Sequence, residues 1–427
     1  MGSFSSPLSG LTAAQDQLQT VSNNLANIDT DGYKDQTLTF SDIFAQTSAT
    51  NGSGDPLQTG SGVAVSSTDS DFTEGTKDTT DVSSNMLISG NGFFVTQSST
   101  GAQDYTRAGD FTTNNAGQLT TPNGELVLGY PAVSGVVNTS AALQPLQVGN
   151  LSSPAVASTT MNISANLDAD STVGDTASSS LPVYDSLGTS HTLSVTYTMT
   201  AADTWSYNVT IPSSDLTPAG TGATTTVASG TLNFNSQGVL TSVQPTGAAA
   251  TSDPSAGITI TIPPSGTTLA DGAAAMPITW NLETAGSPTI TQTATASGTS
   301  ATSTNGFASG TLSNYTVGTD GTIEGTFSSG QTLALGQVAV ASFANNQGLA
   351  DSGNNDYQPT AASGSAVIGV AGTGGRGTVI GGSVEESNVN IASEFAKLIV
   401  AQQAYSANAK SITTFNQVSQ STLQMLQ

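Results

Sequence analysis

The residues nearest the amino terminus follow a seven-residue apolar repeat. Between Pro7 and Lys34, Leu11, Leu18 and Leu25 are spaced by seven, and Ala14, Val21 and Ile28 recur by seven between them. This alternation of three and four places all six side chains along one side of a helix. The pattern predicts an amphipathic helix whose apolar seam packs against another helix.

A second repeat of the same kind covers residues 389–426 at the other end of the sequence. One register contains Ile391, Leu398, Tyr405, Ile412 and Leu426, and the other contains Phe395, Ala409 and Leu423. The remaining faces of both predicted helices are nearly uncharged, whereas solvent-exposed helices normally carry interspersed acidic and basic pairs. A terminal helix commonly docks on its own domain. We favour a pairing of the two helices with each other and with further copies, because about 360 residues of non-helical sequence separate them.

The intervening sequence changes to a period of two, which is typical of strands. Turn-forming sequences such as Pro122-Asn123-Gly124 separate the apolar runs. Strands in the style of the first β region return after a Thr, Ala and Ser tract at 291–305, so we expect one β domain to be inserted into another. The predicted boundaries are 1–34 for the first helix, 35–62 for a linker or extended segment, 63–149 and 291–368 for the two parts of the inner β domain, 150–290 for the inserted outer β domain, and 369–427 for a flexible glycine-rich connector and the last helix. The predicted fold class is therefore mixed and mainly β, with helical termini that form a coiled-coil-like core.

Charge excludes one large class of partner. The chain of 427 residues has 30 acidic and 6 basic residues, a net charge of −24. Nucleic-acid binding is not expected, because Lys and Arg contacts to phosphates supply most of its affinity. No window is apolar over the roughly 18 residues that a membrane span needs. The first residues lack the basic and apolar regions of a cleaved signal peptide, so we expect a cytoplasmic protein or one exported by another route.

Catalytic and metal-binding patterns are scarce. The sequence has no cysteine, and its single histidine, His191, has no recognisable partner along the chain. Acidic pairs such as Asp168 and Asp170 lack the spacing of a calcium loop, and the glycines at 372–377 lack the lysine of a phosphate-binding loop. We therefore expect no enzyme activity, no cofactor and no metal site.

Three groups of motifs stand out in the sequence. The amino-terminal ones are Ser9–Ala14, Ser22–Asn27 and Thr30–Lys34, the carboxy-terminal ones are Glu385–Val389, Glu394-Phe395 and Gln402–Lys410, and the β-domain ones are Asn91–Val95 and Tyr105–Phe111. Together they resemble the motifs of one known family, the bacterial flagellar rod and hook proteins. An acidic residue is commoner at the position of Asn416 in relatives of this family, so Asn416 departs from the pattern. The length and the additional β domain near 150–290 favour a hook-type member over the shorter distal rod type.

The resemblance implies a structural subunit that polymerises into a curved, bendable hollow tube, which transmits torque from the rod to the filament. It also implies partners: the distal rod protein, the hook cap protein, the hook–filament junction protein and the flagellar type III export apparatus. The expected location is the extracellular part of the flagellum, reached without a cleaved signal peptide. The alternatives are a distal rod-type axial protein and a non-flagellar surface-layer or adhesin subunit.

The apolar seams give this interpretation a physical basis. Surface left exposed on both helices of a monomer favours association with further copies, and a head-to-tail contact that does not close produces a helical filament. We therefore expect the free subunit to have disordered ends, with flexible joints at 45–62 and 364–382. The predicted assembly interface consists of Leu11, Ala14, Leu18, Val21, Leu25, Ile28, Ile391, Phe395, Leu398, Tyr405, Ile412, Leu423 and Leu426.

Overall fold

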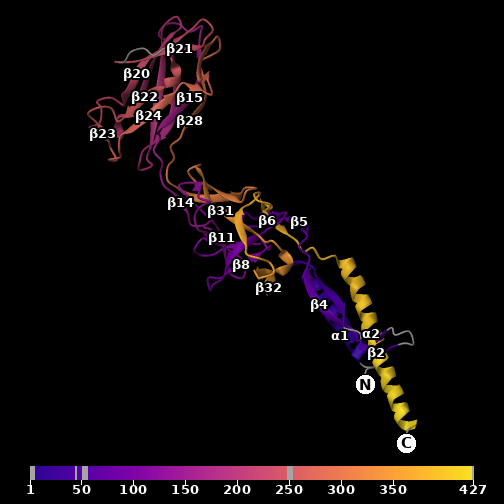
Figure 1. The fold of residues 1–427 in the computed structure, drawn as a ribbon. Helices are drawn as coiled ribbons and strands as arrows, with labels where there is room; N and C mark the ends of the chain where they lie inside the picture. The colour runs from indigo at the N-terminus through magenta and orange to yellow at the C-terminus, as the bar shows by residue number, and fades with distance from the viewer. Residues whose placement is uncertain (1–4, 44–45, 51–55, 248–252, 426–427) are drawn as a thin grey trace. The chain divides into compact units, whose positions relative to one another are not determined.

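The computed structural model describes residues 5–43, 46–50, 56–247 and 253–425. The chain divides into two compact units (Figure 1). The first unit comprises Met1–Asn150, Asn314–Gly325 and Leu333–Gln427, and the second comprises Leu151–Ser313 and Thr326–Thr332. The second unit is thus built mostly from one long segment that interrupts the first.

Two helices belong to the first unit, α1 (Ser5–Ala26) and α2 (Ile391–Met425). The side chain of Asn390 caps α2 by accepting a hydrogen bond from the Ser393 amide at 3.1 Å. After α1 the chain turns at Gly32, which has a φ of +71° that favours glycine. The mainly β fold with helical ends is as the sequence predicts. Neither helix in the described part of the chain is long and apolar enough to cross a membrane.

The predicted linker at 35–62 contains strands. β1 (Gln36–Asp42) pairs antiparallel with β4 (Val63–Ser70), and β2 (Gln46–Thr50) pairs antiparallel with β3 (Pro56–Thr59). Both β1 and β4 contact α1. The alternating Thr and apolar residues at 37–40 suit a strand, and this periodicity decides the structure of β1 although Ser, Gly and Asn are common in the sequence that follows.

The β core of the first unit is a sheet buried on both faces. Its central order is β31-β11-β7-β8-β33-β32. Phe94 packs into a cluster on one face, together with Val127 and Val340, whereas Phe93 and Val95 pack into a second cluster on the other face. Continuous apolar runs such as Phe93-Phe94-Val95 result from this double burial. The strands of this unit other than β1 to β4 are β5 (Lys77–Thr79), β6 (Met86–Ser89), β7 (Phe93–Gln97), β8 (Gln103–Thr106), β9 (Thr112–Thr113), β10 (Leu119–Thr120), β11 (Leu126–Val133), β12 (Val136–Val137), β13 (Gln144–Pro145), β31 (Thr332–Ser342), β32 (Ala350–Gly353), β33 (Asp356–Gln358), β34 (Val367–Val370), β35 (Thr378–Gly381) and β36 (Ser383–Glu385), with the short helix η3 at Asn346–Gly348.

The glycine-rich segment expected as a flexible connector at 364–382 forms strands instead. β34 pairs with β31, and β35 pairs with β6. The glycines serve turns and close contacts: a Cβ on Gly377 would lie 2.3 Å from the carbonyl oxygen of Ser89. Glycine content therefore reflects tight packing of backbone on backbone here.

The second unit is a β-sandwich. One sheet has the order β16-β17-β18-β20-β21, and the other has β22-β24-β15-β27 with β28 also on β15. Both contribute to one core in which Trp205 and Trp280 are fully buried. The strands are β14 (Ser152–Ser153), β15 (Thr160–Asp168), β16 (Thr176–Tyr184), β17 (Ser190–Ala201), β18 (Thr204–Pro212), β19 (Leu216–Thr217), β20 (Thr224–Phe234), β21 (Leu240–Pro245), β22 (Ile258–Ile262), β23 (Thr268–Leu269), β24 (Met276–Asn281), β25 (Glu283–Thr284), β26 (Ser287–Pro288), β27 (Ile290–Thr293) and β28 (Gly298–Thr304), with the short helices η1 (Ser213–Asp215) and η2 (Pro254–Ala256). β29 (Gly310–Val317) and β30 (Thr322–Phe327) have residues in both units.

This unit extends beyond the predicted boundary at residue 290. β27 and β28 both pair with β15, near the start of the unit. Their Thr and Ser residues resemble a polar tract in sequence, but backbone pairing with an apolar strand makes them part of the sandwich.

Candidate assembly interface

The helices α1 and α2 lie side by side and run antiparallel (Figure 1). Near one end, the side-chain amide of Asn24 donates to Glu394 Oε2 at 3.1 Å. Near the other end, Gly10 lies so close to α2 that a Cβ on it would be 2.9 Å from the Asn408 side chain. The residue pairs 24–394 and 10–408 fix the antiparallel register.

Five of the six predicted apolar residues lie in α1, and Ile28 follows the end of the helix at Ala26. Ala14 and Val21 are buried, and the other four, Leu11, Leu18, Leu25 and Ile28, are partly buried. α1 thus pairs with α2 of its own chain, as the repeats predict, whereas the expectation of disordered ends assumed that neither helix has a partner in the free subunit.

The predicted apolar residues of α2 have a different environment. Leu398 and Ile412 are partly buried, whereas Ile391, Phe395, Tyr405 and Leu423 are exposed, and Leu426 is outside the described residues. The buried residues of α2 are Glu394 and Ala401. Small and polar side chains therefore face α1, and much of the apolar surface of α2 faces away from it.

The last described part of α2 is exposed to solvent in the single chain. Every residue from 413 to 425 is exposed, including Val418 at 57% and Leu423 at 62%. An isolated helix of this length is marginal in water, because nucleation is unfavourable and tertiary packing supplies most helical stability. The stability of this exposed segment as a helix therefore depends on further contacts.

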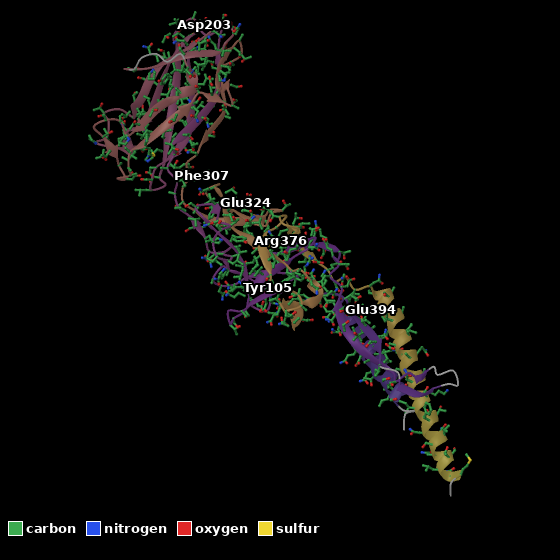
Figure 2. The ribbon with its side chains drawn as sticks, in the orientation of Figure 1. Tyr105, Asp203, Phe307, Glu324, Arg376 and Glu394 are labelled. Atoms are coloured by element: carbon green, nitrogen blue, oxygen red, sulfur yellow. The ribbon has the colours of Figure 1, made fainter. Side chains whose placement is uncertain are left out.

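Asn24 joins the helix pair to the chain that follows α1. Its side chain is fully buried and donates to Asp35, to the Gln36 carbonyl at 2.8 Å and to Glu394. Its carbonyl oxygen accepts from the Tyr33 hydroxyl at 3.0 Å and the Gln36 amide at 3.1 Å. Burial, reinforced by Asp35, raises the pKa of Tyr33 to about 12, so the phenol keeps the proton that it donates. Figure 2 shows Glu394 near the start of α2.

A buried ionic network lies next to this polar cluster. Lys34 Nζ contacts Glu385 Oε1 at 2.5 Å, and Arg107 Nη1 contacts Glu385 Oε2 at 3.2 Å. Lys34 also donates to the Thr73 carbonyl at 2.7 Å, and Arg107 donates to the Ile88 carbonyl at 2.9 Å. Burial lowers the pKa of both cations, while Glu385 raises it in opposition. One carboxylate thus holds together residues from three distant stretches of sequence.

Comparison with known proteins gives matches along most of the chain. Four family descriptions match: "Flagella basal body rod protein" at residues 7–34, "Flagellar hook protein FlgE/F/G D1 domain" at 87–169, "Flagellar basal body protein FlaE D2 domain" at 150–307 and "Flagellar basal body rod FlgEFG protein C-terminal" at 380–425. The flagellar hook protein FlgE of Salmonella typhimurium is 35% identical over 97% of this chain and 98% of its own length. The corresponding protein of Treponema pallidum is 32% identical over 97% of both chains.

The chain belongs to the flagellar hook protein family. Among solved structures, a Helicobacter pylori flagellar hook protein FlgE2 aligns with 71% of this chain and 98% of its own at 15% identity, with a TM-score of 0.48. That superposition is too weak to support a detailed comparison.

The motifs that resemble the flagellar rod and hook proteins converge in space. Lys34, Arg107 and Glu385 each come from a different motif and meet in the buried network. Asn388, from the carboxy-terminal motif, accepts from the Asp35 amide at 2.7 Å and donates to the Asp71 carbonyl at 2.8 Å. Sequence reasoning did not identify these polar residues as structurally important. A usable signal was that three of only six basic residues, Lys34, Arg107 and Lys410, fall inside the motifs.

Proposed function

We propose that this chain is a structural subunit of the bacterial flagellar hook, which polymerises through α1 and α2 into a curved, bendable hollow tube and transmits torque from the rod to the filament. The observation that carries the proposal is the uncovered apolar surface of α2. Ile391, Phe395 and Leu423 are exposed in the single chain, as is all of 413–425. Membership of the family of flagellar hook proteins agrees with it.

The free energy for such assembly comes from burying this apolar surface. Each buried methylene contributes about 0.8 kcal/mol, and α2 offers large side chains on more than one face. The side facing α1 is already occupied, so a further copy would pack on the remaining faces. A contact between different surfaces of two identical subunits continues as a helical filament when it does not close into a ring.

The partners in this proposal follow from the position of a hook in the flagellum. We expect the distal rod protein at one end, the hook cap protein during growth and the hook–filament junction protein at the other end. Export would use the flagellar type III apparatus, without a cleaved signal peptide, to an extracellular location. The role is structural, with no catalytic step assigned to any residue.

Substitution of one exposed apolar residue tests the assembly surface. Val418→Asp should prevent tube formation by purified protein, because it places a charge in the surface that a neighbouring copy would bury. Val173→Asp is the matched control, since Val173 is also exposed, at 69%, but lies in the second unit. Tubes are observed by negative-stain electron microscopy, and far-ultraviolet circular dichroism verifies that both monomers stay folded.

Normal tubes from the Val418→Asp protein would contradict the role of α2 in assembly. Failure of the unmodified protein to form tubes at any concentration or salt level would contradict the proposed function itself.

A further inference from the structure

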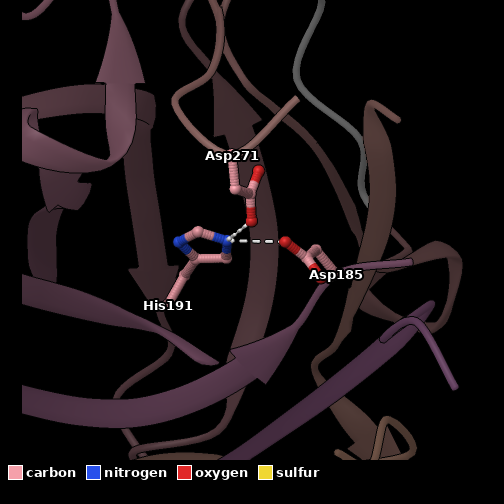
Figure 3. A group of neighbouring side chains, drawn as sticks. All are labelled: Asp185, His191 and Asp271. Atoms are coloured by element: carbon pink, nitrogen blue, oxygen red, sulfur yellow. Dashed lines mark hydrogen bonds and ion pairs between the residues drawn. The ribbon is translucent and has the colours of Figure 1, made fainter. Parts of the chain in front are cut away.

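A histidine and three aspartates gather at one end of the sandwich in the second unit. His191 lies near the start of β17, Asp185 begins the turn after β16, Asp215 ends η1, and Asp271 lies in the loop before β24. His191 Nε2 is 3.2 Å from Asp185 Oδ2 and 3.9 Å from Asp271 Oδ2, while Nδ1 is 3.0 Å from Asp215 Oδ2. Figure 3 shows Asp185 and Asp271 directed toward the same ring nitrogen.

Sequence reasoning found no partner for His191 because its partners come from separate turns. The tertiary structure buries His191 and Asp185 almost completely, while Asp215 and Asp271 keep about a quarter of their side-chain surface exposed. Solvent therefore reaches the cluster from the Asp271 side. An ion would have an entry path there.

The charges in this cluster are not balanced by the protein. None of the 6 Lys and Arg residues of the chain lies between residues 108 and 375, so the second unit contains neither. His191 is the only side chain there that can become cationic near neutral pH. Three carboxylates around it retain a net negative charge even when the imidazole is protonated. Partly buried charges of one sign normally attract a counter-ion.

Hydrogen bonds orient two of the groups toward a common point. Asp185 Oδ1 accepts from the Leu187 amide at 2.8 Å and the Thr189 amide at 2.9 Å, which leaves Oδ2 facing His191. With Nδ1–H donating to Asp215, the lone pair of Nε2 is directed toward Asp185 and Asp271. A carboxylate holding the far nitrogen of a histidine is a common support for a metal ligand.

We propose that Asp185 Oδ2, His191 Nε2 and Asp271 Oδ2 bind a divalent transition-metal ion of the Zn²⁺ class, with Asp215 orienting the imidazole. These three ligand atoms lie within 4.8 Å of one another. Zn²⁺ bonds of about 2.0–2.1 Å in a tetrahedron place ligand atoms about 3.3 Å apart, so small movements complete the site. Two carboxylates and a neutral imidazole neutralise a divalent ion, and water fills the fourth position.

The ligand set also selects among metals. An imidazole nitrogen suits zinc and its neighbours, whereas Ca²⁺ and Mg²⁺ prefer sites made of oxygen atoms only. Asp185 directly follows β16 and His191 lies on β17 of the same sheet, whereas Asp271 precedes β24 of the opposite sheet. A bound ion would therefore link the two sheets at this end of the sandwich and stabilise the second unit.

Tryptophan fluorescence reports on this unit alone, because both tryptophans, Trp205 and Trp280, are in its core. Full-length protein is first stripped with a chelator, then unfolded in denaturant with and without ZnCl₂, below the concentration at which it polymerises. We expect ZnCl₂ to raise the unfolding midpoint, MgCl₂ to leave it nearly unchanged, and isothermal titration calorimetry to give one zinc per chain.

Substitutions distinguish a specific metal site from non-specific binding of zinc to an acidic protein. Asp271→Asn and His191→Gln should lose the zinc-dependent shift, and Asp215→Asn should bind about 10–100-fold more weakly, because its loss frees the imidazole. Asp203→Asn, an exposed aspartate of the same unit outside the cluster, should behave as the unmodified protein does.

Two results would overturn the metal site. One is the absence of any zinc-dependent shift, which would leave His191 as an imidazolium paired with its carboxylates. The other is an equal shift in Asp271→Asn, His191→Gln and the unmodified protein.

Discussion

At the scale of single residues, the first unit places several carboxylates where water cannot fully solvate them. Asp356 on β33 pairs with Thr106 of β8 and is 5% exposed. Burial, followed by the charges of Glu125 and Asp104, raises the pKa of Asp356 to about 7. This group makes the folded state dependent on pH in the neutral range.

The sign of that dependence follows from proton linkage. Below about pH 4 the Asp356 carboxyl is protonated in both the folded and the unfolded chain, so its ionisation does not change the free energy of folding. Between about pH 4 and about pH 7 the unfolded chain releases the proton first, and the contribution of Asp356 to folding becomes increasingly unfavourable. Asp356→Asn should therefore stabilise the protein at pH 8 and have a much smaller effect near pH 4.5, as measured by urea unfolding followed by circular dichroism.

Asp42→Asn provides the control, since Asp42 is exposed at the end of β1. Its effect on the unfolding midpoint should be small at both pH values. A gain in Asp356→Asn that is equal at pH 4.5 and pH 8 would contradict the linkage argument, because an isosteric amide removes only the ionisation.

At the scale of elements, Glu385 connects the turn after α1, the end of β8 and the end of β36. It is the shared partner of Lys34 and Arg107, and it also accepts from the Gly75 amide at 2.9 Å. Gly32 completes the contact, because a Cβ there would lie 2.5 Å from the Ala108 amide nitrogen. The helix pair and the β core are therefore held together by a contact that requires both a buried carboxylate and a glycine.

Neutralising Glu385 should destabilise this contact strongly. Glu385→Gln leaves two buried cations with no anionic partner in their network, and breaking a buried pair in this way costs about 3–5 kcal/mol. The expected result is a lower urea midpoint for the circular dichroism signal of the first unit, with the tryptophan transition of the second unit unchanged.

Glu386→Gln is the matched control because Glu386 is the adjacent acidic residue and is exposed. Its free energy of unfolding should stay within about 0.5 kcal/mol of the unmodified value. Comparable losses in Glu385→Gln and Glu386→Gln would show that the network has no special role in docking the elements.

At the scale of the whole molecule, charge opposes the association of copies. A net charge of −24 makes subunits repel each other, and the basic residues that could offset it are absent between 108 and 375. Apolar burial on α2 has to exceed this repulsion for a tube to grow. The balance between them can be shifted with salt.

Polymerisation should become easier as ionic strength rises. Raising NaCl from about 0.05 M to about 0.5 M shortens the screening length from above 10 Å to below 8 Å, so the critical concentration for tube formation should fall. Sedimentation of tubes at several protein concentrations measures it. A critical concentration that rises with NaCl would mean that attractive ion pairs, and not apolar contacts, hold the copies together.

Local patterns in the sequence predict much of this fold. The seven-residue repeats predict both helices, and α1 buries Ala14 and Val21 of the predicted seam. Alternation of apolar and polar residues predicts the strands of the sandwich, such as β17 with its alternately buried residues. These features depend on neighbours within one element, and the periodicity of side chains is therefore sufficient to predict them.

Periodicity does not indicate which side of α2 faces α1. The repeats treat Phe395 and Leu398 as equivalent, whereas the structure turns Glu394 and Ala401 toward α1 and leaves Phe395 exposed. Which side of α2 faces α1 depends on the residues of α1. The buried side-chain amide of Asn24 donates a hydrogen bond to Glu394, and the small side chain of Ala401 allows the helices to approach closely. Likewise, the predicted flexible connector becomes β34 and β35 because open strand edges accept it.

The sequence by itself determined the helical ends, the β-rich middle, the acidic charge and, through its motifs, the family. Only the tertiary structure decided that Lys34, Arg107 and Glu385 meet, and that His191 lies among three aspartates. The physical reason is range: helical and strand patterns are set by residues a few positions apart, whereas these clusters join side chains separated by up to 351 residues, whose encounter depends on how the elements pack.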